Sequence, residues 1–586
     1  MRGPVLPPER TPAPSARRPV PPVHPPVPPV RRTGGDPAPY SGRTVHDLLL
    51  RGGTLVDGTG APRRAADVAV TDGRVTVLPP GGRHEAAETV DASGQVVAPG
   101  FIDVHTHSDA LAAHHEDHRP GVGGPREEAM AALRLAPLLQ GVTTEIAGNC
   151  GSSLFPALPE RLPRLAEHLR VVFGLGPVPP AEDFEAFAAG QDPARRRTHI
   201  ASLVGHGTLR AGVLGFADRP ATDAELRAMC ALLDRSLAQG AAGLSTGLIY
   251  PPGGYADTGE LVALAEVAAR HGKPYVTHLR DEMSQVERAL EEALEIARRS
   301  GAALQISHHK TAGRQAWGAT LRTLPRLERA RAEGIDVLCD VYPYTAGSTV
   351  LHALLPPWVN EGGIRALLER LPGPEVRDRI RRSIAEGVDG WENTVGNGGW
   401  DLISVAAAPR HPSAEGRRIA DLAGSRGVDP VEYVCDLLLA EDGEVTIISH
   451  SMREDDVRRV LASPLAMIGS DGVPKPGRPH PRWAGSFARV IGHYGRDQGL
   501  FTLEEAVHRM TGLPARRFGL TGRGTVRDGD RADLVVLDPD AVRDGATFDR
   551  PLLAPEGIGT VVVAGRVAVR AGRPTRERAG EVVRVV

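Results

Sequence analysis

Between residues 99 and 519 the chain alternates short apolar runs with longer amphipathic stretches. The apolar runs have the length of buried strands, and the amphipathic stretches repeat their apolar positions at helical spacing. Helices are predicted over Asp223 to Gln239, Gly259 to His271 and Met283 to Ser300. Alternation of this kind predicts βα units and a mostly parallel sheet, the α/β class.

Eight of the apolar runs are interpreted as strands of that sheet. They end near His107, Cys150, His206, Thr246, His278, His308, Tyr342 and Asp471. Eight βα units in one chain predict a (β/α)8 TIM barrel, which we place at residues 99–519. The interval from Ala346 to Ala440 is too long for an ordinary connection, so it is predicted to be a lid or substrate-shaping insertion.

Short alternating runs broken by turns flank the barrel region at 46–98 and 520–586. Asp-Gly pairs between β-branched runs are hairpin signals. Because the chain ends of a domain are often close, the two segments are expected to pair into one small β-sandwich domain. Residues 1–45 are crowded with proline and contain no apolar stretch typical of a secretion signal, which predicts a disordered, polyproline-like tail.

Composition narrows the class of protein. The chain has 586 residues, 41% hydrophobic and 24% charged, which is typical of a globular enzyme. A net charge of -3 without a basic stripe predicts no nucleic-acid partner, and the lack of an apolar run near 18 residues predicts no membrane span. Four cysteines in so long a chain do not make a disulfide framework, which favours a cytoplasmic location.

Candidate metal ligands follow the apolar runs. His105 and His107 occupy alternate positions at the end of one run, so a strand would point both imidazoles the same way, and imidazole suits zinc. Four other potential ligands end runs of their own: Cys150, His278, His308 and Asp471. For each alone a buried core residue is the commoner explanation. Because strand ends converge on one face of a barrel, all six together favour a metal site.

The chain contains a set of distinctive motifs at and near the predicted strand ends: Val-Val-Ala-Pro-Gly-Phe-Ile-Asp-Val-His-Thr-His, Gly-Asn-Cys-Gly, Gly-His-Gly-Thr-Leu-Arg, Leu-Ser-Thr-Gly-Leu-Ile-Tyr-Pro-Pro-Gly, Ile-Ser-His-His-Lys, Asp-Val-Tyr-Pro-Tyr and Ile-Gly-Ser-Asp-Gly. Together they resemble those of a known family, the D-aminoacylase (N-acyl-D-amino-acid deacylase) branch of the amidohydrolase superfamily. The resemblance runs from about His46 to Val586. His-x-His belongs to the whole superfamily, whereas Gly-Asn-Cys-Gly with Ile-Ser-His-His-Lys points to this branch.

The resemblance implies a zinc enzyme. In this branch a cysteine thiolate replaces the carboxylated lysine that bridges two metals elsewhere in the superfamily, and Cys150 matches that cysteine. None of the chain's three lysines ends a strand where the bridge would lie. Cys150, His278 and His308 are therefore expected to hold one tight zinc. His105 and His107, with Cys150 and Asp471, would form a second, weaker site.

The implied reaction is hydrolysis of the linear amide of a small N-acyl-D-amino acid to a carboxylate and a free D-amino acid. Asp471 would act as the catalytic base and then as the acid, while zinc activates water and polarises the amide carbonyl. The family match places Lys310 and either Tyr342 or Tyr344 near the substrate. Further candidates for binding the substrate carboxylate are Arg459 and Arg482, although a position on the surface is the commoner explanation for an arginine.

Two other functions stay open at this point. A relative that cleaves cyclic amides, like the hydantoinases and dihydroorotases, would keep the barrel and the metal. A non-catalytic binding protein would keep the fold alone. The intact ligand set and Asp471 argue against the second of these.

Overall fold

The computed structural model describes residues 45–111, 125–175, 179–191 and 196–586. Residues 1–44 of the predicted proline-rich tail lie outside the described residues, whereas Val45, its predicted last residue, begins the first strand. Residues Val45–Val586 form one compact unit. The predicted domain boundaries at 98 and 520 lie within this unit and stay predictions.

Two arcs of parallel strands form the centre of this unit. One arc has the order β6-β7-β8, and the other has the order β9-β10-β11-β12-β13-β17. The strands are β6 (Phe101–Asp103), β7 (Val142–Ala147), β8 (His199–Ser202), β9 (Val204–Gly205), β10 (Leu244–Gly247), β11 (Tyr275–His278), β12 (Leu304–Ile306), β13 (Val337–Val341) and β17 (Ala466–Ile468).

The two arcs join at both ends. Strand β8 continues into β9 through Leu203, whose N–H donates to Ala147 of β7, while the next N–H, of Val204, donates to Gly243 beside β10. Beyond β6 and β17, a parallel bridge pairs Thr106 with Gly472. The strand order is therefore that of the predicted (β/α)8 barrel.

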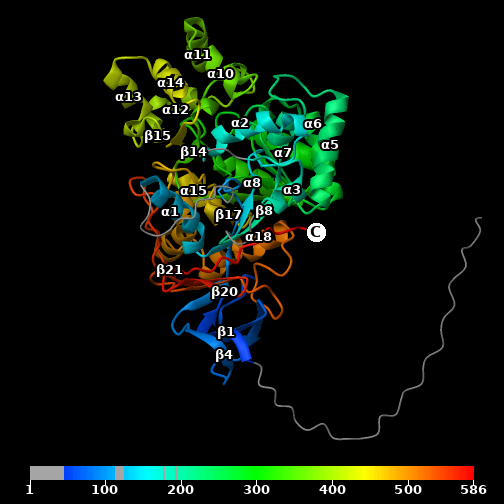
Figure 1. Cartoon of the computed structure of the whole chain (residues 1–586), viewed down its shortest axis with the longest axis vertical. Helices are drawn as coiled ribbons and strands as arrows, with labels where there is room; N and C mark the ends of the chain where they lie inside the picture. Colours follow the sequence, from blue (N-terminus) through cyan, green and yellow to red (C-terminus); the bar gives the residue numbers. More distant parts are fainter. Residues whose placement is uncertain (1–44, 112–124, 176–178, 192–195) are drawn as a thin grey trace, which may run out of the picture. The chain divides into compact units, whose positions relative to one another are not determined.

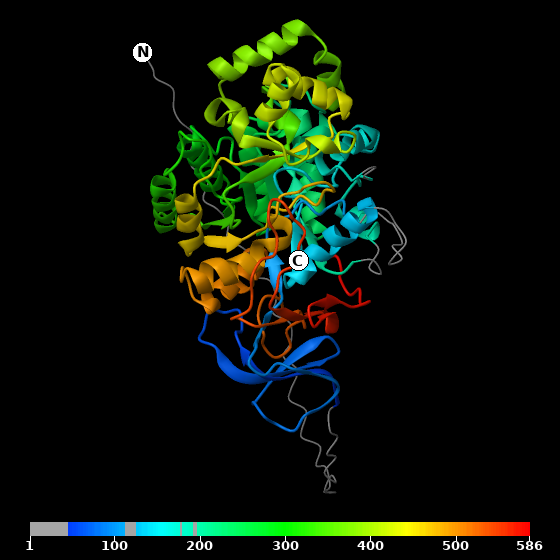
Figure 2. The ribbon, with the colours of Figure 1, turned by 90° about the vertical axis from the view of Figure 1, so that its left-hand side faces the viewer.

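Helices surround the strands, as Figures 1 and 2 show. Those that follow or precede barrel strands are α1 (Pro125–Leu139), α2 (Leu162–Phe173), α3 (Phe184–Ala189), α4 (His206–Val213), α5 (Asp223–Ala238), α6 (Thr258–Arg270), α7 (Val286–Ser300), α8 (Thr320–Ala332), α15 (Glu454–Ala462), α16 (Arg482–Arg489), α17 (Leu503–Met510) and α18 (Gly512–Arg517). The predicted helices match α5 and α6 to within one residue at each end.

Helix α7 begins three residues later than its pattern predicts. Asp281 accepts hydrogen bonds from the backbone N–H groups of Met283 (2.7 Å) and Gln285 (2.9 Å), which fixes a turn before Val286. An aspartate side chain that bonds the backbone two residues ahead competes with helix formation. The loop between β11 and α7 is therefore ordered rather than helical, and it carries Glu282.

The two predicted terminal β segments share one sheet. Its order is β21-β20-β19-β18-β5-β1-β2-β3, with β4 on β1, and residues Val96–Pro99 of β5 pair antiparallel with β18. The strands are β1 (Val45–Leu55), β2 (Arg64–Thr71), β3 (Arg74–Leu78), β4 (Glu85–Asp91), β5 (Val96–Pro99), β18 (Leu534–Leu537), β19 (Ile558–Val563), β20 (Arg566–Arg570) and β21 (Arg573–Pro574).

The long interval after β13 forms a substructure of its own. An antiparallel sheet with the order β14-β16-β15 packs with short helices around a separate apolar core, coloured green to yellow in Figure 1. The elements are β14 (Gly347–Val350), α9 (Pro357–Asn360), α10 (Ile364–Arg370), α11 (Pro374–Glu386), α12 (Thr394–Gly398), β15 (Ile403–Ala407), α13 (Ile419–Arg426), α14 (Pro430–Ala440) and β16 (Thr446–Ser449). The insertion thus reaches β16, beyond the predicted end at Ala440.

Candidate metal centre

The six predicted ligands all lie at or just beyond the carboxyl ends of barrel strands. His278 is the last residue of β11, while Cys150, His308 and Asp471 follow β7, β12 and β17 by two or three residues. His105 and His107 follow β6. Residues at these ends face the same side of a barrel, which brings together side chains far apart in sequence.

Three of these residues have left-handed backbone conformations. The φ angles are 50° at Cys150, 32° at His308 and 51° at Asp471. Residues other than glycine rarely adopt positive φ, and such strain persists only where the surroundings enforce it, commonly at active sites. Each of the three strands thus ends in a sharp turn that directs its side chain into the site.

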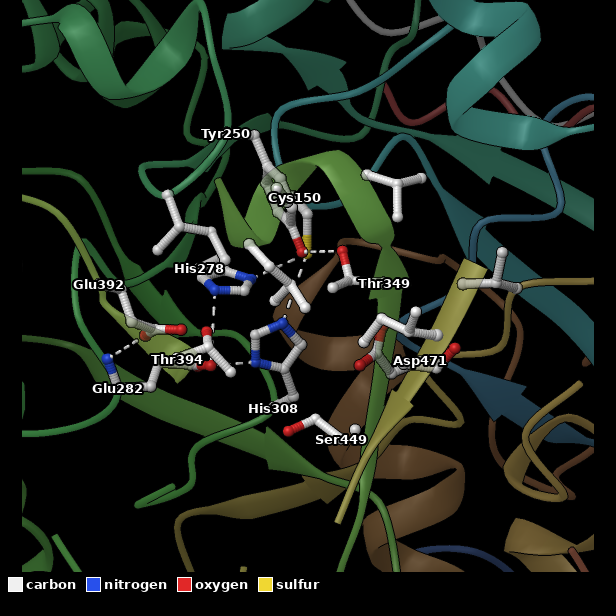
Figure 3. Close-up of a pocket in the computed structure, with 18 of the residues that line it drawn as sticks. Cys150, Tyr250, His278, Glu282, His308, Thr349, Glu392, Thr394, Ser449 and Asp471 are labelled. Atoms are coloured by element: carbon white, nitrogen blue, oxygen red, sulfur yellow. Dashed lines mark hydrogen bonds and ion pairs between the residues drawn. The ribbon is translucent and has the colours of Figure 1, made fainter. Parts of the chain in front are cut away.

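The thiol of Cys150 is the meeting point of three imidazoles. Its Sγ lies 3.3 Å from His105 Nε2. It also lies 3.6 Å from His278 Nδ1 and 3.4 Å from His308 Nε2, and these two contacts are drawn in Figure 3. Two ligands bound to tetrahedral zinc at about 2.0–2.3 Å are separated by roughly 3.3–3.8 Å. The sulfur and nitrogen donors therefore have both the chemistry and the spacing that zinc requires.

Asp471 connects this group to a second one. Its Oδ1 lies 3.4 Å from His105 Nε2 and 3.2 Å from His107 Nε2. The donor atoms of His105, His107, Cys150 and Asp471 all lie within 4.8 Å of one another, as do those of Cys150, His278 and His308. Cys150 belongs to both groups, which is an arrangement suited to one or two metal ions that share the sulfur.

Charge within this cluster favours ionised ligands. Burial opposes ionisation of the Cys150 thiol, but His105 and His308 overcome it and hold its pKa well below the usual range. Burial likewise opposes the charged form of Asp471, and Arg482 with His308 and His105 lowers its pKa well below the usual range. A thiolate and a carboxylate are the forms that bind a divalent metal.

Two buried carboxylates lie behind the histidines. Asp340 Oδ1 lies 3.1 Å from His105 Nδ1 and accepts the backbone N–H of His308 at 2.8 Å. Glu282 lies against His278 and His308. Such outer carboxylates orient metal-binding imidazoles and set their tautomers.

A cavity opens over the cluster and is closed on one side by the insertion. Thr349 of β14 and Ser449 of β16 line the same cavity as His308 and Asp471, and all four are labelled in Figure 3. The hydroxyl of Tyr250 contacts Thr349 Oγ1 at 3.0 Å and links a barrel loop to β14. Apolar lining comes from Val172, Ile249, Met283, Val350, Leu354, Ile447 and Met452.

Lys310 and Tyr342 line the cavity next to the candidate ligands. The Lys310 ammonium lies 2.6 Å from Glu282 Oε2 and donates to the His308 carbonyl at 3.1 Å. The Tyr342 hydroxyl is buried and has no hydrogen-bond partner among the described residues. Of the two predicted tyrosines, the structure thus brings Tyr342 to the cavity.

Arg482 and Tyr344 lie behind this lining. The Arg482 Nη1 pairs with Asp471 Oδ2 at 2.7 Å, and its guanidinium carbon lies 4.6 Å from the centre of the Tyr342 ring. Arg482 is 0% exposed, so the default explanation of a surface arginine is wrong for it. Tyr344 is not among the residues that line the cavity, and its ring packs against Arg489 instead.

Arg459 lies away from the site. It is on α15, where its guanidinium contacts Asp456 at 3.0 Å and the Thr320 hydroxyl at 2.5 Å. These contacts tie α15 to α8 in the outer helical layer, and Arg459 does not line the cavity. Its position therefore does not support the predicted contact with the substrate carboxylate.

Arg459→Ala is accordingly expected to leave the KM for substrate unchanged within about twofold, because a partly exposed ion pair contributes little and touches no bound molecule. Steady-state kinetics with the deacylase substrates proposed below would check this. An increase in KM of tenfold or more would contradict the placement of Arg459.

Three residues that contact the cluster were not singled out from the sequence. They are Tyr250, Glu282 and Asp340. Each had a signal in the sequence. Tyr250 stands in the motif Leu-Ser-Thr-Gly-Leu-Ile-Tyr-Pro-Pro-Gly, Asp340 opens the Asp-Val-Tyr-Pro-Tyr motif at the end of β13, and Glu282 follows His278 by four residues. Residue spacing does not predict that the loop after β10 brings Tyr250 to the site.

The chain is similar to known proteins over most of its length. Residues 88–569 match the model of the amidohydrolase family. A D-aminoacylase of Alcaligenes xylosoxydans xylosoxydans is 38% identical over 92% of this chain and 97% of its own length. An N-acyl-D-glutamate deacylase of Bordetella bronchiseptica, whose structure contains zinc and a phosphonate mimic of the tetrahedral intermediate, is 39% identical with a TM-score of 0.75, covering 92% of this chain and 100% of that one.

A second solved structure concerns the binuclear metal centre of a D-aminoacylase, described as having one-metal activation and second-metal attenuation. It is 36% identical, with a TM-score of 0.75, and covers 92% of this chain and 100% of that one. A D-hydantoinase of a Bacillus species is 16% identical with a TM-score of 0.52 over 92% of this chain and 99% of that one, a likeness of fold alone.

Proposed function

The chain belongs to the amidohydrolase family, and we propose that it is a zinc-dependent deacylase, which hydrolyses the linear amide of N-acyl-D-amino acids to a carboxylate and a free D-amino acid. The observation that carries the proposal is the Cys150 thiol, held within 3.3–3.6 Å of three imidazoles at the base of a cavity. Deacylases similar over nearly the whole chain support it. The cyclic-amide alternative has only a likeness of fold.

The metal would be held by side chains already described. Cys150, His278 and His308 would form the tight zinc site, and His105 and His107 with Asp471 a weaker one that shares the sulfur. Bound zinc would supply Lewis acidity, polarising the amide carbonyl and making the attacking water easier to ionise.

Asp471 is suited to move the proton. Its low pKa keeps it a carboxylate at neutral pH, and it lines the cavity beside the ligands. It would accept a proton from the attacking water and then deliver that proton to the leaving nitrogen. Base and acid are the same group, which restores the carboxylate at the end of each turnover.

Lys310 and Tyr342, which both line the cavity, are suited to bind the α-carboxylate. The Lys310 ammonium lies 5.8 Å from the centre of the Tyr342 ring, and the Tyr342 hydroxyl is unpartnered among the described residues. Arg482 lies behind this lining, with its guanidinium carbon 4.6 Å from the same ring, and supports Tyr342 rather than the substrate. Ammonium and phenol groups both donate hydrogen bonds to carboxylates. This grip would fix the substrate with its amide toward the metal.

The cavity predicts which D-amino acids react fastest. Of the described residues that line it, Lys310 is the only lysine or arginine, and it is already paired with Glu282. The lining histidines His168 and His352 are neutral at pH 7, because burial lowers their pKa to about 4 and about 3. The side-chain carboxylate of a D-glutamate or D-aspartate substrate would be desolvated in this cavity without forming an ion pair in return.

We therefore expect kcat/KM for N-acetyl-D-leucine and N-acetyl-D-methionine to exceed that for N-acetyl-D-glutamate and N-acetyl-D-aspartate by at least about tenfold. The matching L forms should react poorly. Measured initial rates on this panel decide both points. A preference for acidic side chains would contradict the interpretation of the cavity, whereas no turnover of any D substrate by zinc-loaded protein would refute the deacylase itself.

Among the described residues no helix is long and apolar enough to cross a membrane. All four cysteines are free. A cytoplasmic location stays a prediction.

A further inference from the structure

Glu282 contacts three functional groups of the site at once. It lies in the loop between β11 and α7 and is 3% exposed. Its Oε1 lies 3.0 Å from His308 Nδ1, and its Oε2 lies 3.4 Å from His278 Nε2 and 2.6 Å from Lys310 Nζ. Figure 3 shows the contacts that run from both rings to this carboxylate.

The ring nitrogens that face Glu282 are those that do not face Cys150. His278 directs Nδ1, and His308 directs Nε2, toward the sulfur. A nitrogen that binds metal must offer its lone pair, so the other nitrogen of each ring must carry the proton. A carboxylate beside both of these nitrogens favours the tautomers in which each carries its proton, and these are the metal-binding tautomers of the two ligands.

The position of Lys310 gives a second reason for a carboxylate at this point. Its ammonium lies only 2.6 Å from His308 Nδ1. When His308 binds metal through Nε2, Nδ1 carries a proton and two donors face each other. Glu282 resolves this conflict, because it offers one oxygen to Nδ1 and the other to the ammonium.

The backbone of Glu282 is fixed from several sides. Its N–H donates to Glu392 Oε2 at 2.6 Å, and its carbonyl accepts from the Ala312 N–H at 2.8 Å. Glu392 belongs to the insertion, so the same peptide joins barrel, insertion and metal centre. Such restraint gives the carboxylate one position rather than the range open to a surface glutamate.

We propose that Glu282 is a positioning residue that couples the two halves of the site: it orients His278 and His308 for zinc and holds the Lys310 ammonium where the substrate carboxylate binds. The second half of this statement rests on the proposed deacylase function. The first half concerns zinc affinity alone and stands without it.

The test is Glu282→Gln in the full-length chain, with zinc affinity measured by competition against a chromophoric chelator. Loss of an outer partner of metal-bound histidines typically costs about 10–100-fold in affinity, and we expect a loss of that size. At saturating zinc, the KM for N-acetyl-D-methionine should also rise, because Lys310 loses its anchor. Wild-type zinc affinity together with wild-type KM would overturn the proposal.

Glu292→Gln is the matched control. Glu292 is an ion-paired glutamate on α7 whose partner is Arg280 at 2.9 Å, and it does not line the cavity. Its variant should bind zinc as the wild type does. An equal loss of affinity in both variants would mean that general loosening of this segment is responsible, and would overturn the specific role.

Glu282→Asp keeps the test decisive if the glutamine variant does not fold. It retains the charge but withdraws the oxygens by one methylene, so zinc affinity should fall while the thermal unfolding midpoint of the metal-free protein stays near that of the wild type. Unchanged zinc affinity in a folded Glu282→Asp protein would overturn the proposal. If the wild-type protein had no deacylase activity, the proposed function would fail, but the zinc affinities of the variants would still decide whether Glu282 positions the two histidines.

Discussion

Cys150→Ala is expected to lose the tight zinc and nearly all turnover. The thiol is common to both groups of candidate ligands, so its removal leaves neither group intact. The loss of zinc affinity should exceed the roughly 10–100-fold that follows removal of an outer partner, because a thiolate ligand itself is gone. Alanine keeps the Cβ atom, so the positive φ of 50° at this position is strained to the same extent in both proteins.

The measurement is zinc per chain after dialysis, together with kcat/KM for N-acetyl-D-methionine. Cys230→Ala is the matched control, because Cys230 is half-buried on α5 and away from the cavity, and it should retain both zinc and turnover. A Cys150→Ala protein that keeps one zinc per chain and wild-type turnover would refute the metal centre on which the proposed function depends.

The ligand positions could be predicted because each depends on a local pattern. An apolar run that ends in a histidine, cysteine or aspartate identifies a strand end, and barrel topology then brings all such ends to one face. Cys150, His278 and His308 are far apart in sequence, and the strand-end pattern placed them on one face with the other three candidates. Their separate grouping as one tight site came from the family resemblance. The two terminal β segments were also predicted to pair, and β5 does pair with β18.

The arginines and tyrosines could not be assigned in the same way. Arg459 and Arg482 both lie in helices of ordinary composition, yet one joins α15 to α8 and the other is fully buried against Asp471. Which helix end reaches the cavity depends on the path of loops, and residue spacing does not encode that path. Tyr342 and Tyr344 are two positions apart just after the end of β13. The turn that follows the strand brings the first to the cavity and not the second, and the sequence does not predict the path of that turn.

The strained backbone at the site could not be predicted from the sequence either. Asp471, in Ser-Asp-Gly, has the pattern of an ordinary turn, but its φ of 51° directs the carboxylate between His107 and Arg482. This backbone conformation is strained for residues other than glycine, so the surrounding contacts must stabilise the folded chain by more than the strain costs. Because Cys150 and His308 share the feature, the barrel holds three site residues in conformations that isolated turns would avoid.

Asp471→Ala is expected to keep zinc at Cys150, His278 and His308 while losing turnover by about 10²–10⁴-fold, the usual contribution of a positioned acid–base group. Asp471 is not among the three tight ligands, and its Oδ1 lies against His105 and His107 instead. Occupancy of the weaker site should fall for the same reason. Zinc per chain and single-turnover rates at saturating substrate separate the loss of chemistry from the loss of metal.

Asp456→Asn controls for the removal of a buried aspartate beside an arginine. Asp456 is 3% exposed and pairs with Arg459, as Asp471 pairs with Arg482, but it lies outside the cavity. Its variant should keep both zinc and turnover. If Asp471→Ala lost the tight zinc as completely as Cys150→Ala does, Asp471 would be a principal ligand, and the proton transfer would have to be assigned to another group. If the Asp471→Ala protein kept wild-type turnover, Asp471 would be excluded as the base, because another group would then have to accept the proton.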